Sequence, residues 1–343
     1  MEPSTLGSTR RSATVAMEDP DATSDSDKTS RERKPPVPIT KRDSEAREPT
    51  QKSSDTPPSV ASSASLTKVD AVQPITVLSI AGSDSGGGAG IQADLRTFAA
   101  FGVHGTTAVT SVTAQNTLGV SDVAVMPVSL VVSQVRSVIE DFAVTSVKTG
   151  MLGDADVVES VADLAREGMF PYLVVDPVLI SSTQHSLMRD GGAAAYREAL
   201  FPWATVVTPN LREASILCGV DVRDISSLED MHWLARELLS LGPRYVLVKG
   251  GHFAASGVDA MVPDILMSSD EVIIFESPRV VTTNDHGTGC SLSAALCAGL
   301  GLGRRVNDAT RDAKSFVLSA LQGATDWHLG QGRGPLDHLG WNE

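Results

Sequence analysis

A glycine-rich turn that opens a helix is the part of the sequence best suited to chemistry. It runs from Asn284 to Cys290, and residues 291–299 after it are rich in Ala, Leu and Ser, which favour helix. Glycine lets backbone approach a ligand, and the first N–H groups of a helix are unpaired and partly positive. Such a turn can bind phosphate or the negative charge that develops during phosphoryl transfer. We expect the same field to favour the thiolate of Cys290.

Polar side chains that follow other apolar segments could complete a phosphoryl-transfer site. Asp176 and Glu213 offer carboxylates, and Mg²⁺ prefers one or two carboxylates together with phosphate oxygens and water. Lys249 offers positive charge for phosphates. Each residue alone has a structural alternative: a strand-to-helix turn with a buried cysteine, a turn-forming Asp before Pro177, or a solvated lysine. Their combination favours phosphoryl transfer, in which positioning and charge stabilisation supply most of the catalysis.

These residues require a scaffold of alternating strands and helices. Short β-branched runs predict strands at 75–81, 105–112, 144–149, 171–176, 205–210 and 245–249, then an antiparallel pair at 258–266 and 271–276. Helices are predicted at 91–101, 127–142, 154–167, 228–241, 289–300 and 306–322, with one more carrying Glu213; residues 280–283 also have strand character. The alternation predicts an α/β fold with a mostly parallel sheet covered on both faces.

The predicted strands end in small or polar residues, namely Gly82, Gln115, Asp176, Asn210 and Lys249. Ligands of open α/β sheets bind at the carboxyl edge of the strands, so one site assembled from several loops is expected. The loop at 82–90 is rich in glycine but has neither Walker nor Rossmann spacing. His252 and His286 have no partners at zinc-ligand spacing, so no zinc site is expected.

The first 70 residues differ in composition from the rest. They contain no aromatic residue and are crowded with Ser, Thr, Pro and charge, so we predict a disordered tail at 1–70 and a folded domain at 71–343. The tail holds 12 acidic and 11 basic residues, so the net charge of −14 belongs almost entirely to the folded part. That acidity argues against nucleic acid or an anionic membrane as partner. Three cysteines without ligand spacing, and no apolar run of membrane-spanning length, predict a cytoplasmic protein.

Six segments in collinear order resemble the hydroxymethylpyrimidine/phosphomethylpyrimidine kinases of the ribokinase-like superfamily. They are residues 81–95, 113–117, 148–152, 208–213, 249–252 and 286–290, and the resemblance covers residues 75–339. It implies a three-layer α/β/α fold and phosphorylation by ATP and Mg²⁺. The implied substrate is 4-amino-5-hydroxymethyl-2-methylpyrimidine, phosphorylated on its hydroxyl and then on the resulting monophosphate, in thiamine diphosphate biosynthesis or salvage. A homodimer is also implied.

The resemblance assigns roles to particular residues. Gln115 would pair with the aminopyrimidine edge, because a carboxamide offers both a donor and an acceptor. Gly82, Asp94 and Met151 would shape the pyrimidine pocket; Lys249, Asn210 and Thr288 would contact ATP; Asp176 and Glu213 would organise Mg²⁺; Gly287 and Gly289 would form the anion site. Cys290 would accept the proton of the substrate hydroxyl.

The sequence departs from the family's pattern at two positions. Asp285 stands where Thr is expected, and Ser85 stands where many relatives have Pro. We expect Asp285 to point away from the anion site and make a turn contact. Two other functions remain open: a pyridoxal kinase on the same frame, and a catalytically weak pyrimidine sensor. The intact set of Lys249, Asp176, Glu213 and Cys290 argues against the sensor.

Overall fold

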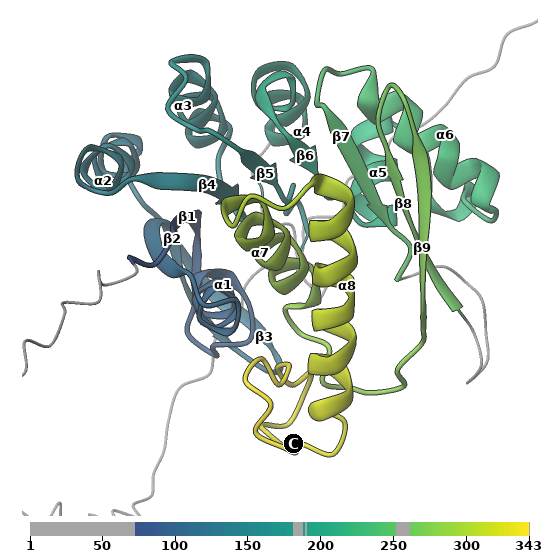
Figure 1. Ribbon diagram of the computed structural model, residues 1–343. Coiled ribbons are helices and arrows are strands. Elements are labelled where there is room, and N and C mark those ends of the chain that lie inside the picture. Colours follow the sequence, from purple (N-terminus) through teal and green to yellow (C-terminus); the bar gives the residue numbers. More distant parts are fainter. Residues whose placement is uncertain (1–72, 181–187, 189–190, 252–260, 343) are drawn as a thin grey trace, which may run out of the picture. The chain divides into compact units, whose positions relative to one another are not determined.

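The computed structural model describes residues 73–180, 188, 191–251 and 261–342 (Figure 1). The predicted tail at 1–70 and His252 lie outside the described residues. The strands are β1 Thr76–Asp84, β2 His104–Asn116, β3 Gly119–Val125, β4 Val144–Thr149, β5 Leu173–Val175, β6 Val206–Val207, β7 Tyr245–Lys249, β8 Met261–Met267 and β9 Val272–Pro278.

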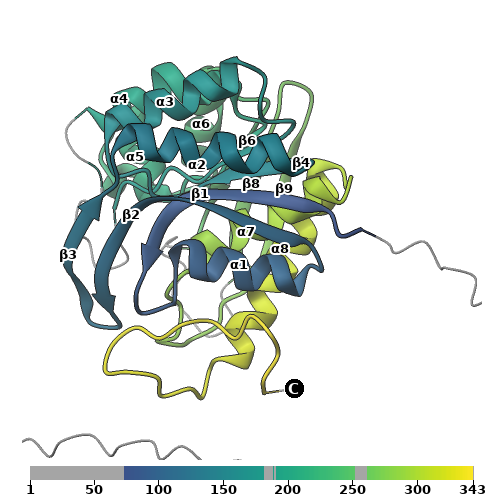
Figure 2. The same cartoon turned by 90° about the vertical axis from the view of Figure 1, so that its left-hand side faces the viewer.

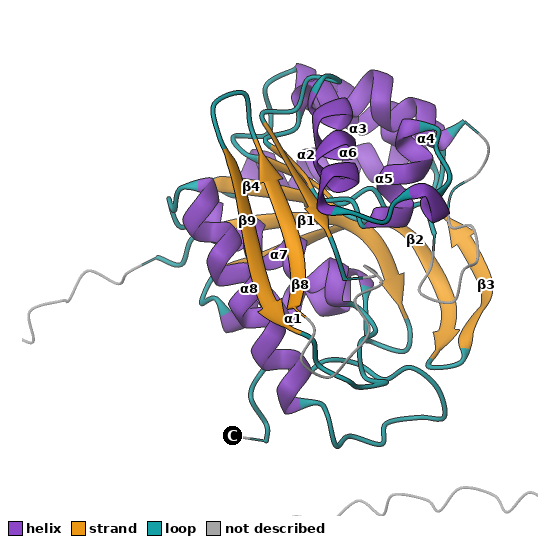
Figure 3. Cartoon of the chain, turned by 90° about the vertical axis from the view of Figure 1, so that its right-hand side faces the viewer, coloured by secondary structure: helices purple, strands orange, loops and turns teal. Residues whose placement is uncertain are grey.

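These strands form a single sheet in the order β3-β2-β1-β4-β5-β6-β7-β8-β9. From β2 to β7 each strand is parallel to its neighbour, whereas β3, β8 and β9 pair antiparallel at the two edges (Figure 3). The mostly parallel sheet and the antiparallel pair after residue 258 were both predicted. The parallel strands alternate with helices in sequence, so their carboxyl ends meet at one edge.

Helices cover both faces of the sheet, as expected for a three-layer α/β/α fold (Figure 2). They are α1 Gly90–Ala100, α2 Val128–Asp141, α3 Ala155–Arg166, α4 Gly192–Ala195, α5 Leu211–Cys218, α6 Leu228–Leu239, α7 Thr288–Gly301 and α8 Val306–Gly323, with short helical turns at Tyr196–Leu200, Phe201–Trp203 and Val222–Asp224. One face is covered by α2 to α6 and the other by α1, α7 and α8 (Figure 2). Each face holds its own apolar core.

The central helix α7 explains why the glycine-rich turn is fixed in space. Residues 291–300 of this helix are all buried between the sheet and α8. A helix that is buried on all sides needs small or apolar residues around its whole circumference, and residues 291–300 have this composition. Its first turn therefore cannot shift relative to the strand ends that it faces.

Two details of the predicted elements were wrong. Residues 280–283 do not form a strand; they are a connection that leads from β9 to α7. Strand β3 was not predicted, because most of its side chains are exposed and it lacks the alternation of apolar residues that marks a strand. It pairs with β2 and extends the edge of the sheet beyond Gln115.

Candidate active site

An open cavity lies at the carboxyl edge of the parallel strands. The residues singled out in the sequence that line it are Gly82, Gln115, Met151, Asp176, Asn210, Glu213, Lys249, Gly287, Thr288, Gly289 and Cys290. Seven separate segments of the chain thus contribute to one site. Cys290, Gln115 and Lys249 share this cavity, which the kinase interpretation requires.

The start of α7 is built by close backbone contacts that only glycine permits. Gly287 has a φ of 92°, and a Cβ added there would lie 1.9 Å from the carbonyl oxygen of Gly88. The two glycine-rich loops therefore pack directly against each other. A Cβ at Gly289 would lie 3.1 Å from Nζ of Lys249, so the first turn of α7 also adjoins the lysine. No side chain caps this helix end, as the predicted anion site requires.

The thiol of Cys290 is less acidic than the sequence suggested. Burial raises the pKa of Cys290 to about 11, although the charge of Lys148 opposes this and the backbone N–H of Gly90 donates to the sulfur. The expectation that the helix end would favour the thiolate is therefore wrong for the protein without ligand. Desolvation by the surrounding elements outweighs the field of one helix terminus.

Asp176 lies at the centre of a polar cluster on one side of the cavity. Its carboxylate accepts hydrogen bonds from the hydroxyl groups of Thr208 and Ser293, each at 3.2 Å, and pairs with Lys249 Nζ at 3.0 Å. The side chain is 3% exposed. Partners from three places thus hold this carboxylate, which follows β5: Ser293 comes from α7, Thr208 follows β6 and Lys249 ends β7.

Glu213 has a structural role that the sequence analysis missed. Asn210 and Glu213 form a capping box at the start of α5: the carboxamide accepts from Glu213 N at 3.0 Å, and the carboxylate accepts from Asn210 N at 2.9 Å. The spacing of Asn and Glu could have revealed it. Burial raises the pKa of Glu213 to about 8 against the opposing charge of Lys249. Within the described residues no group of three or more His, Cys, Asp or Glu could hold a metal. The charge of Asp176 also raises the pKa of Glu213, so the two carboxyl groups lie near each other.

Asp94 does not reach the cavity. It is completely buried behind the wall, where it pairs with Lys148 Nζ at 2.6 Å and accepts from the hydroxyl of Ser79 at 2.6 Å. Lys148 is fully buried yet lines the cavity beside Cys290. Burial lowers the pKa of Lys148, but the negative charges of Asp94, Cys290 and Asp176 together outweigh it and raise the pKa overall. The sequence analysis missed this pair, although a lysine inside the apolar strand 144–149 was a visible signal.

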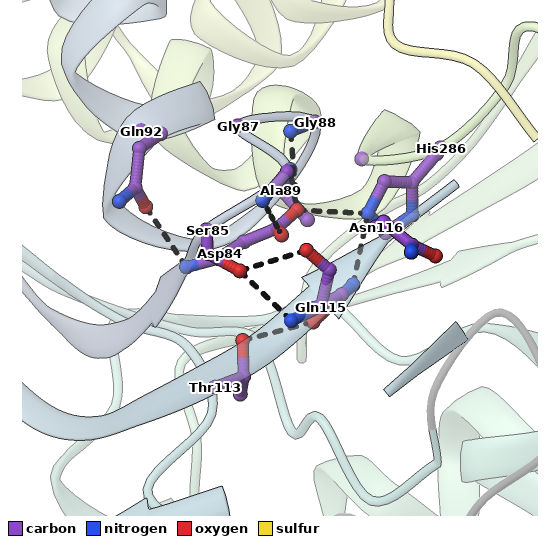
Figure 4. A network of polar contacts seen from close by, with 12 residues as sticks. Asp84, Ser85, Gly87, Gly88, Ala89, Gln92, Thr113, Gln115, Asn116 and His286 are labelled. Atoms are coloured by element: carbon purple, nitrogen blue, oxygen red, sulfur yellow. Dashed lines mark hydrogen bonds and ion pairs between the residues drawn. The ribbon is translucent and has the colours of Figure 1, made fainter. Parts of the chain in front are cut away.

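Gln115 belongs to a network that joins three loops (Figure 4). Its side-chain nitrogen lies 3.1 Å from Nε2 of His286, which in turn lies 2.9 Å from the carboxylate of Asp84. The hydroxyl of Thr113 donates to its side-chain oxygen at 3.1 Å. Asp84 also accepts from the backbone of the first glycine loop, at Gly88 and Ala89 among others. The carboxamide is thus held in place, and the contribution of His286 was missed in the sequence.

Gly82 and Met151 form a shared apolar wall near Gln115. A Cβ at Gly82 would lie 3.3 Å from Cε of Met151 and 2.7 Å from Oγ of Ser111, so only glycine leaves room for both side chains. Met151 is buried to 9% exposure but still lines the cavity. Gly82 and Met151 thus line the same cavity as Gln115.

Asp285 does not make the turn contact that was expected. It lines the cavity and forms an ion pair with Arg333, which lies beyond α8 near the end of the chain. Nε of Arg333 donates to one carboxylate oxygen at 2.7 Å, and a terminal nitrogen donates to the other. Asp285 and Arg333 are 48 positions apart in the sequence, so no local pattern could predict that they form an ion pair.

None of the described helices is long and apolar enough to cross a membrane. The family model for phosphomethylpyrimidine kinase matches residues 84–337. The hydroxymethylpyrimidine/phosphomethylpyrimidine kinase of Streptomyces coelicolor is 45% identical over 270 residues, which cover 79% of this chain and 96% of that protein.

Two solved structures extend the comparison. An ADP complex of Bacillus subtilis pyridoxal kinase has a TM-score of 0.69 and 35% identity, and the match covers 78% of this chain and 98% of that one. A phosphomethylpyrimidine kinase from Clostridium difficile has a TM-score of 0.63 and 35% identity, with 72% and 99% of the two chains covered. The chain therefore belongs to the phosphomethylpyrimidine kinase family, within the ribokinase-like fold.

Proposed function

We propose that this protein phosphorylates 4-amino-5-hydroxymethyl-2-methylpyrimidine with ATP and Mg²⁺, and then phosphorylates the monophosphate to the diphosphate. The observation that carries the proposal is the shared cavity of Gln115, Cys290 and Lys249. A carboxamide suited to an aminopyrimidine edge lies on one side. A lysine and two carboxylates lie on the other, with the anion-binding turn between them.

The carboxylates of Asp176 and Glu213 suit a magnesium ion. Magnesium binds through one or two carboxylates with water and phosphate oxygens. Asp176 and Glu213 would hold the ion, which would supply positive charge to neutralise the phosphates. Lys249 would contact the phosphates, and Asn210 and Thr288 would line the nucleotide's path. The nucleotide side of the cavity thus holds both charge types that MgATP needs.

The reacting hydroxyl would lie beside Cys290. Gln115 orients the pyrimidine ring, and Gly82 with Met151 forms the apolar wall against it. The hydroxyl oxygen bonds to the γ-phosphorus while the bond from that phosphorus to the bridging oxygen of ADP breaks, and ADP leaves with the electron pair. The amides of Gly287, Gly289 and Cys290 stabilise the transferring group. The hydroxyl proton passes to the thiolate of Cys290, which forms by loss of the thiol proton to water before the reaction.

A coupled assay with MgATP and three acceptors tests the proposal: the pyrimidine alcohol, its monophosphate and pyridoxal. Turnover of the first two is expected. Pyridoxal kinase is the second candidate, because solved pyridoxal kinases superpose with TM-scores of up to 0.70. Turnover of pyridoxal alone would overturn the proposal, and tight pyrimidine binding without turnover would indicate a sensor. The homodimer implied by the resemblance stays a prediction, which the molar mass in solution would test.

A further inference from the structure

The ion pair of Asp285 and Arg333 lies on the pyrimidine side of the cavity. Asp285 directly precedes His286, whose ring adjoins Gln115. The backbone N–H of Arg333 donates to the carbonyl of Thr117 at 3.0 Å, two residues after Gln115. Both members of the pair are thus tied to the loops that hold the carboxamide.

The segment that carries Arg333 is fixed by backbone contacts. The N–H of Gly334 donates to Thr283 O at 3.1 Å, and the N–H of His286 donates to Gly334 O at 3.0 Å. A Cβ at Gly332 would lie 2.1 Å from the carbonyl oxygen of Thr117, so this close approach requires glycine. Arg333 therefore projects from a rigid frame, with a side chain that is 41% exposed at the cavity.

The cations that line the cavity have different surroundings. Among the described residues they are Lys148, Arg212, Lys249 and Arg333. Lys148 is fully buried against Asp94, and Lys249 pairs with Asp176 on the nucleotide side. Arg212 follows Leu211 on α5, in the helix turn that holds Glu213. Only Arg333 of this set lies beside the loops around Gln115.

We propose that Arg333, oriented by Asp285, binds the phosphate of the monophosphate substrate in the second reaction. The inference rests on the proposed function. In that reaction a phosphate oxygen of the monophosphate dianion bonds to the γ-phosphorus, the bond to ADP breaks, and ADP leaves with the electron pair. Two anions must approach each other, so a cation on the acceptor side lowers their repulsion. A guanidinium presents a planar fork of N–H donors that suits both carboxylate and phosphate.

The role of Asp285 follows from the same geometry. The bidentate contact fixes the plane of the guanidinium, so less side-chain entropy is lost when phosphate binds. The departure of Asp285 from the family's pattern is thereby explained by its partner.

The test compares both reactions in Arg333→Gln. We expect kcat/KM for the monophosphate to fall about 10- to 100-fold relative to kcat/KM for the alcohol, the usual effect of losing a hydrogen bond to a charged group. The loss should appear as a higher KM for the monophosphate. Arg333→Lys keeps the charge but not the planar fork of donors, so its kcat/KM for the monophosphate should lie between those of the wild type and Arg333→Gln. Both reactions are measured on one preparation, so their ratio does not depend on the fraction that is folded.

Arg304→Gln is the matched control. Arg304 also pairs with an aspartate, Asp312, and its side chain is 42% exposed, but it lies outside the cavity. Its ratio of kcat/KM values should equal that of the wild type. An unchanged ratio in Arg333→Gln, or an equal loss in both reactions, would overturn the inference. If the wild type phosphorylates neither acceptor, the proposed function itself fails, which is a separate result.

Discussion

Replacing Cys290 by alanine should lower kcat by about 10²–10⁴-fold, the usual span for a residue that accepts a proton in the transition state. Binding of the pyrimidine should change little, because a thiol contributes only a weak hydrogen bond. Calorimetric titration with the pyrimidine and steady-state kinetics with MgATP would separate the two effects. The sulfur lies at the cavity surface within the first turn of α7, so its removal leaves the helix and the anion site in place.

Because the pKa of Cys290 is raised, kcat should increase with pH. With a pKa of about 11, only about one thiol in a thousand is ionised at pH 8. The thiolate accepts the proton, so kcat at saturating MgATP should rise about ten-fold per pH unit between about pH 7 and 9. The alanine variant should have a flat profile over the same range. A variant that retains full turnover, or one that keeps the wild-type slope, would remove Cys290 from the mechanism.

Cys297→Ala supplies the control on the same helix. Cys297 is fully buried and lies 3.2 Å from the hydroxyl of Ser146, away from the cavity. The chemical change is identical, so a general effect of removing a thiol from α7 would appear here as well. We expect turnover and its pH profile to stay close to those of the wild type.

Three further predictions concern other parts of the molecule. Affinity for Mg²⁺ should rise about ten-fold per pH unit below about pH 8 and level off above it, because the ion must displace the proton that burial holds on Glu213. Calorimetry in two buffers would count the proton released, and an affinity that does not depend on pH would contradict this prediction. Lys148→Met should lower the free energy of unfolding in urea by about 3–5 kcal/mol, because Asp94 stays buried without its partner, and adding Asp94→Asn should restore much of the loss. Deleting residues 1–70 should leave kcat and KM unchanged, whereas a large loss of activity would show that this segment belongs to the kinase.

The sequence predicted the frame of the site because the relevant signals are local. Buried parallel strands are apolar runs, and the polar residue that ends each run lies at the ligand-binding edge. Gln115, Asp176 and Lys249 were found in this way, and they share one cavity. The same logic missed β3, whose exposed side chains carry no apolar pattern.

Properties that depend on distant elements could not be predicted. The acidity of Cys290 is set by burial beneath other loops, which a local pattern does not contain. Asp94 was assigned to the pocket, but its pairing with Lys148 across two elements holds it behind the wall. The ion pair of Asp285 and Arg333 joins segments whose spacing has no regular period. In each case the missing information is which side chains meet in three dimensions.

The attachment of residues 331–335 to the cavity limits where this protein can be shortened or joined to another chain. The hydroxyl oxygen of Thr117 accepts hydrogen bonds from the N–H groups of Gln331 and Gly332, each at 3.1 Å. These bonds attach the segment after α8 to the edge of the sheet. A truncation just after Gly323 would keep every described strand and helix. It would nevertheless remove buried side chains such as Leu336 and His338, and it would leave the acceptor side open to water, without Arg333. A fused partner should therefore be attached after this segment through a spacer.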